Sequence, residues 1–129
     1  MVLPGIQAVF GFQLIAPFNA GFASLGLTEQ KLHFCALILV AISISLIMTP
    51  AAYHRIAEKG LVSRRFVEIA SGLLTCAMLP LILGLTVDLF VVTRIILNDV
   101  SISIGIASLM LFLFFTLWYV FPLIARRRC

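Results

Sequence analysis

Apolar residues fill most of the chain in long runs, and short polar intervals separate these runs. Four runs approach the roughly 20 residues of helix that a bilayer core about 30 Å thick requires. They lie at about residues 6–22, 32–52, 66–90 and 101–124. The pattern predicts an all-α, polytopic membrane protein whose four transmembrane helices form an up-down bundle. Residues 1–129 are expected to form one transmembrane domain.

The longest polar interval, residues 53–65, lies between the second and third runs and is predicted to be a connector. Basic residues indicate which side of the membrane it faces, because cytoplasmic segments carry an excess of lysine and arginine. Seven of the nine lysine and arginine residues fall in this connector or in the tail, namely Arg55, Lys59, Arg64, Arg65, Arg126, Arg127 and Arg128. Only Lys31 and Arg94 lie in the two short links. We therefore expect the connector and both termini to be cytoplasmic.

The composition excludes a water-soluble domain. Hydrophobic residues make up 63% of the 129 positions, charged residues 11%, and the mean hydropathy is +1.21. The net charge of +4 comes from basic residues at the edges of apolar runs, where anionic lipid headgroups are the natural counter-charge. The expected partners are the lipid bilayer, including anionic lipids, and either further copies of the chain or another membrane protein. No nucleic acid is expected.

Two groups of polar residues are candidates for specific contacts. Gln7, Gln13 and Asn19 lie in the first run and are predicted to form interhelical hydrogen bonds rather than a substrate path. Tyr53, His54 and Arg55 directly follow the second run and are predicted to dock on a lipid or a partner. The alternative for this second group is generic pairing of cations with a helix C-terminus.

Ionisable residues inside a membrane are candidates for a functional site, so their predicted depth matters. Glu68 falls near the cytoplasmic start of the third run, and Asp88 lies about 30 Å further along an ideal helix. His33 is expected at the outer interface. Because neither carboxylate is predicted to reach mid-membrane, we expect no sodium–proton exchange. Glu68 and Asp88 remain the candidates for proton coupling if the chain is a transporter.

Motifs that would indicate an enzyme are absent from the sequence. It contains no phosphate-binding loop, no dinucleotide-binding glycine pattern and no HExxH or CxxC motif. The three cysteines, Cys35, Cys76 and Cys129, lack metal-ligand spacing. We therefore predict no catalytic, cofactor-binding or metal site, and no cofactor.

Three segments carry a family resemblance. Residues 3–7, residues 10–14 and the PAAYHR segment at 50–55 resemble a family of small bacterial four-helix inner-membrane proteins of unknown function. Some members carry the label of sodium:proton antiporter. The resemblance implies a multi-pass protein of the bacterial inner membrane. Relatives often have a basic residue near Gly21 and an additional polar amino-terminal segment, so Met1 is not established as the native start.

Together these features predict an accessory, assembly or structural role in a homo-oligomer or a larger membrane complex. Polar side chains suited to helix packing, without a carboxylate at mid-membrane depth, favour this function. The alternative is an ion- or proton-coupled transporter, similar to an antiporter, that acts as an oligomer. An oligomer is required because four short spans rarely enclose a pathway alone.

Overall fold

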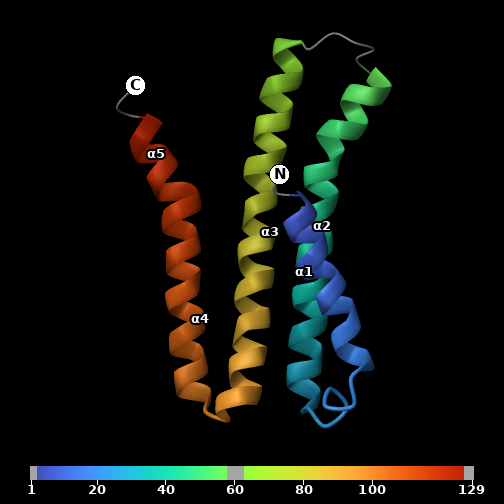
Figure 1. The fold of residues 1–129 in the computed structure, drawn as a ribbon. Helices are drawn as coiled ribbons and strands as arrows, with labels where there is room; N and C mark the ends of the chain where they lie inside the picture. The colour runs from blue at the N-terminus through green and yellow to red at the C-terminus, as the bar shows by residue number, and fades with distance from the viewer. Residues whose placement is uncertain (1–2, 58–62, 127–129) are drawn as a thin grey trace.

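The computed structural model describes residues 3–57 and 63–126, and within these ranges the chain is helical without β-strands. The elements, in order, are α1 (Leu3–Ile15), the 3₁₀ turn η1 (Ala16–Phe18), α2 (Leu27–Ala57), α3 (Arg64–Leu97), α4 (Val100–Phe115), the π-helical turn η2 (Thr116–Val120) and α5 (Phe121–Arg126). Figure 1 shows α2 and α3 as a long antiparallel pair, with α1 beside α2 and the α4–α5 arm beside α3. The prediction of an all-helical fold with four apolar segments is confirmed.

The α2–α3 pair forms the core of the bundle. Buried residues recur on α2 at alternating spacings of three and four, at His33, Ala36, Val40 and Ser43. The matching positions of α3 are Ala77, Leu81, Gly84, Asp88 and Val91, all buried except the half-buried Asp88. This spacing is that of a left-handed coiled coil. The two helices therefore meet along one continuous seam.

Small residues let the two backbones approach closely in this seam. A Cβ atom on Gly84 would lie 2.9 Å from Cγ2 of Val40 and 3.1 Å from the carbonyl oxygen of Ala36. Further along, the Ser43 hydroxyl donates a 2.8 Å hydrogen bond to the carbonyl of Ala77. Close backbone contact with an interhelical hydrogen bond is typical of helix packing in membranes.

The first apolar run is not a continuous helix. α1 has 13 residues and so extends about 20 Å, and it is followed by η1 and by non-helical residues 19–26. Pro17 is one reason for the break, because proline has no N–H to continue the helical hydrogen bonds. Among the described residues, three helical segments are long and apolar enough to cross a membrane, namely Leu27–Ala57, Arg64–Leu97 and Val100–Arg126. The first run gives only a shorter apolar helix.

The link expected at residues 91–100 is mostly helical, since α3 continues to Leu97. The turn to α4 then needs only two residues. Asn98 adopts a left-handed conformation with φ of 50°, and the side chain of Asp99 caps α4 by accepting a hydrogen bond from the N–H of Ile102. At the other end of α3, Ser63 is the N-cap and accepts from the N–H of Phe66.

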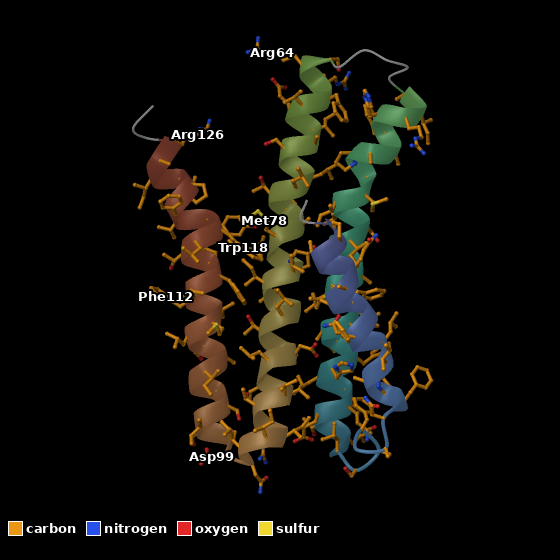
Figure 2. All side chains as sticks on the ribbon, viewed as in Figure 1. Arg64, Met78, Asp99, Phe112, Trp118 and Arg126 are labelled. Carbon is orange, nitrogen blue, oxygen red and sulfur yellow. The ribbon has the colours of Figure 1, made fainter. Side chains whose placement is uncertain are left out.

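Among the long helices, the α4–α5 arm packs mainly on α3. Ser103 and Ala107 are buried against it, and the Tyr119 hydroxyl donates to the carbonyl of Thr75 at 2.6 Å. In Figure 2, Trp118 points toward α3 near Met78, whereas Phe112 points outward. Arg64 and Arg126 lie at one end of the bundle and Asp99 at the other.

Candidate functional site

One polar cluster joins three helices inside the apolar bundle. Gln13 of α1 and His33 of α2 are 3% and 6% exposed, and the side chain of Asp88 on α3 is 20% exposed. The Nδ1 atom of His33 lies 2.7 Å from Oδ1 of Asp88. The amide Nε2 of Gln13 donates to the other carboxylate oxygen, Oδ2, at 2.9 Å. Both oxygens of the carboxylate are therefore engaged.

The imidazole of His33 faces oxygen atoms on both sides. Its Nε2 atom lies 3.0 Å from the carbonyl oxygen of Gln13, opposite the contact with Asp88. A carbonyl oxygen only accepts, so Nε2 must carry a hydrogen. The short contact of Nδ1 with Oδ1 then needs a second hydrogen, held either by the ring or by the carboxyl group. In either case the His33–Asp88 pair shares one proton and has no net charge.

A proline makes the Gln13 carbonyl available to the histidine. In an α-helix this carbonyl would accept from the N–H of the residue four positions later, which here is Pro17. Proline has no N–H, so the carbonyl needs another donor. The Nε2–H group of His33, on α2, is this donor. The break in α1 is thus part of the site.

One buried polar atom in the cluster has no partner within the described chain. The side-chain oxygen Oε1 of Gln13 makes no hydrogen bond. The amide nitrogen must face the carboxylate, so the oxygen is turned away from it. A buried acceptor without a partner costs about 1–3 kcal/mol. The atom is suited to accept a hydrogen bond from a bound molecule.

A cavity of about 310 Å³ opens beside this cluster. Gln13, His33 and Asp88 line it together with eight apolar residues, which are Val9, Phe12, Ala16, Phe22, Leu25, Val91, Val92 and Ile95. The ring of Phe22 meets His33 edge-on, with centroids 5.4 Å apart. A mainly apolar pocket with a few converging polar groups is the common form of a small-molecule site.

The other predicted interhelical residues lie elsewhere. Gln7 and Asn19 are exposed, so of the three polar residues in the first run only Gln13 lies in the cluster. Glu68 is also apart from the site: its side chain is 73% exposed and lies 4.0 Å from the guanidinium of Arg64. Of the two carboxylates singled out from the sequence, only Asp88 lies in a cluster.

The predicted docking residues form part of the contact between α2 and α3. The ring of Tyr53 stacks on Phe66 with centroids 6.1 Å apart, and His54 lies 5.1 Å from the same ring. Arg55 is exposed. Two of the three side chains therefore pack within the chain, and Arg55 is left accessible.

His33 was predicted to lie at the outer interface and not at a site. The seam spacing of α2 was the available signal, since His33 continues the series of Ala36, Val40 and Ser43. Asp88 continues the matching series on α3 beyond Gly84. Pairing the two series in antiparallel order brings His33 to Asp88. Across the described residues, no group of three or more His, Cys, Asp or Glu side chains could hold a metal ion.

Comparison with known proteins identifies the family. The sequence model of a family of unknown function (DUF6328) matches residues 1–122, so the chain belongs to that family. No curated protein and no solved structure matches the chain.

Proposed function

We propose that this family member is a multi-pass protein of the bacterial inner membrane that exchanges a proton at His33–Asp88 for a cation. In this proposal it is a proton-coupled transporter that acts as an oligomer. The single observation that carries it is the contact of 2.7 Å between Nδ1 of the buried His33 and Oδ1 of the half-buried Asp88.

Loss of the proton shared by His33 and Asp88 would favour binding of a cation at the same place. Loss of the shared proton would leave a neutral imidazole against a carboxylate, with a net charge of −1 in apolar surroundings. An unpaired charge in such a medium is strongly unfavourable. A cation bound beside Asp88 would restore neutrality, so proton release and cation binding favour each other. Because an intramembrane carboxylate with this property commonly marks an ion pathway, transport is the function it supports best.

The proposed orientation places the connector and the carboxyl-terminal end in the cytoplasm. The charge pattern supports it, since Arg55, Arg64 and Arg65 belong to the connector and Arg126 lies at the same end of the bundle. The amino end of α1 faces this side, and the turn at Asn98 and Asp99 lies on the outside. The site is then in the outer half of the bilayer, because Asp88 is nine residues, or about 14 Å, before the end of α3 at Leu97.

Transport assays in proteoliposomes test this function. An imposed pH gradient is challenged in turn with sodium, potassium and benzyltrimethylammonium, which carry no exchangeable proton. We expect at least one of them to collapse the gradient. Asp88→Asn should lower the rate by about a hundredfold or more, the scale on which proton-transfer groups usually contribute. Glu68→Gln, a matched loss of an exposed carboxylate, should leave the rate unchanged. A gradient unaffected by every cation would contradict the proposal.

An accessory or assembly role is the second candidate. It is supported by an uncovered groove of about 680 Å³ between α3 and α5, whose wall includes the small residues Ser71, Gly72 and Thr75. Such residues suit close packing of another helix. The same assays separate the two functions. A purely structural role predicts that Asp88→Asn lowers stability or association while the wild-type protein moves no protons.

A further inference from the structure

We infer that the cation exchanged at this site is a lipophilic organic ammonium, which enters from the bilayer between α1 and α3. Ammonium ions that carry N–H groups bind more tightly than quaternary ones. The inference rests on the proposed proton exchange and adds the class of ligand. It is carried by three features of the cavity: its walls, its unpartnered acceptor and its rim.

The walls of the cavity suit a hydrocarbon body with one charged end. Its three polar residues, Gln13, His33 and Asp88, belong to the one hydrogen-bonded cluster, and the other eight lining residues are apolar. At about 310 Å³ it falls at the small end of the range of about 300–1,000 Å³ usual for ligand pockets. The rings of Phe12 and Phe22 add faces that attract cations.

An inorganic cation fits this site less well. Hard divalent ions take about six or more oxygen ligands. The polar cluster offers the two oxygens of Asp88, already hydrogen-bonded, and Oε1 of Gln13. An ammonium group needs fewer partners, because one carboxylate and one neutral acceptor satisfy most of its N–H bonds. The buried Oε1 of Gln13 is an unused acceptor, on a side chain that lines the cavity.

The rim of the cavity is exposed hydrocarbon. Phe12 on α1 is 74% exposed, and Val92 and Ile95 on α3 are 46% and 49% exposed. In the proposed orientation these side chains face lipid, so a ligand with an apolar body can arrive from the bilayer. An adjoining cavity of about 220 Å³ shares Leu25 and Ile95 as walls and is lined by Glu29, Arg94 and Asn98. This second, more polar cavity lies toward the end of the bundle where α3 turns into α4.

The exchange conserves charge at the site. The shared proton leaves Nδ1 and Oδ1 for solvent, the ammonium ion takes its place beside the Asp88 carboxylate, and His33 stays neutral with its hydrogen on Nε2. The nearest other ionisable groups in sequence are Glu29, Lys31 and Cys35 on α2 and Arg94 on α3. The described part of α1 has none, and α4, on another face of α3, has only its cap Asp99. Among the residues that line the cavity, His33 and Asp88 are the two with ionisable side chains.

Binding of 4-phenylbutylammonium to the full chain in lipid nanodiscs tests the inference. Calorimetry in two buffers of different ionisation enthalpy counts the protons released. We expect binding with release of about one proton, and binding at least about tenfold weaker for the neutral isostere 4-phenylbutanol, since charge-assisted hydrogen bonds are roughly twice as strong as neutral ones. Asp88→Asn should remove both the preference for 4-phenylbutylammonium over 4-phenylbutanol and the release of a proton on binding.

Two variants test the geometry without removing the carboxylate. Gln13→Leu should narrow the difference in affinity between 4-phenylbutylammonium and its N,N,N-trimethyl derivative, because only the former can donate to Oε1. Val92→Trp fills the exposed rim and should weaken binding of both while the polar cluster stays intact; Ile69→Trp, at an exposed position of α3 remote from the cavity, is its control. Equal binding of 4-phenylbutanol, or no effect of Val92→Trp, would overturn the inference. Sodium-driven collapse of the pH gradient without ammonium binding would overturn it while leaving the proposed proton exchange standing.

Discussion

At the scale of single residues, the site depends on a backbone carbonyl that its own helix cannot satisfy. Pro17 removes the N–H that would bond to the carbonyl of Gln13, and Nε2 of His33 lies 3.0 Å from that oxygen. The carbonyl fixes which ring nitrogen must carry hydrogen, and this leaves Nδ1 for the shared proton with Asp88. Pro17, which has no polar side chain, thus determines which ring nitrogen of His33 donates to the Gln13 carbonyl.

Replacing this proline tests that dependence. In Pro17→Ala the new N–H competes with His33 for the Gln13 carbonyl, and we expect the Nε2–H bond to weaken. The measurement is the ¹⁵N chemical shift of Nε2 in a His54→Gln background, which leaves His33 as the single histidine of the two. Pro4→Ala is the matched control, because Pro4 lies in the first turn of α1, where no carbonyl of the helix awaits its N–H. Equal shifts in both variants would show that Pro17 does not control the contact.

At the scale of helices, the α2–α3 seam sets the position of the cluster. Ala36 and Val40 meet Gly84, Ser43 meets Ala77, and the same antiparallel register brings His33 to Asp88 and His54 to Phe66. A one-turn slip would move Asp88 by about 5 Å and separate it from the imidazole. Close packing at Gly84 is therefore tied to the proton-sharing pair about one turn away.

Substitution of Gly84 tests the seam. Gly84→Ala places a Cβ atom 2.9 Å from Val40 and 3.1 Å from the Ala36 backbone, and the backbone atom cannot rotate away. We expect a loss of about 1–3 kcal/mol in the free energy of unfolding, the usual cost of overpacking. On the same helix, a Cβ on Gly72 meets nothing within 4 Å, so Gly72→Ala should be neutral or slightly stabilising. Reversible unfolding in mixed micelles measures both, and an equal response would contradict the close approach at Gly84.

The sequence predicted helix type and number better than helix ends or partners. Hydropathy identified the four apolar segments. The end of α3 was predicted wrongly, because the charged Arg94 indicated a link at residues 91–97, which are helical. The Arg94 guanidinium extends to the helix end, where it donates a hydrogen bond to the side chain of Asn98. Gln13 and Asp88 could be chosen as polar residues in apolar runs. Their common partner His33 could not, because hydropathy gives depth along one helix and says nothing of which face meets a neighbour.

At the scale of the whole molecule, the bundle has one strongly basic end and one end closed by short turns. Arg64 and Arg126 lie at the first end, and Asp99 lies at the second (Figure 2). α2 has 31 residues and α3 has 34, so each is about 45–50 Å long, which exceeds the thickness of a 30 Å bilayer core. The proposed orientation therefore puts both ends in contact with water or headgroups, on opposite sides of the membrane.

Two alanine-to-cysteine substitutions test this arrangement with matched chemistry. Ala57 ends α2 at the basic end, Ala23 lies in the segment before α2, and both are exposed. With Cys35, Cys76 and Cys129 replaced by alanine, Ala23→Cys should react with a membrane-impermeant thiol reagent in intact cells. Ala57→Cys should react only after the cytoplasmic side is opened, because the excess of arginine keeps that end inside. Reversed reactivity would invert the orientation and move the His33–Asp88 site to the cytoplasmic half of the bilayer, whereas reaction of both from one side would show that α2 does not cross the membrane.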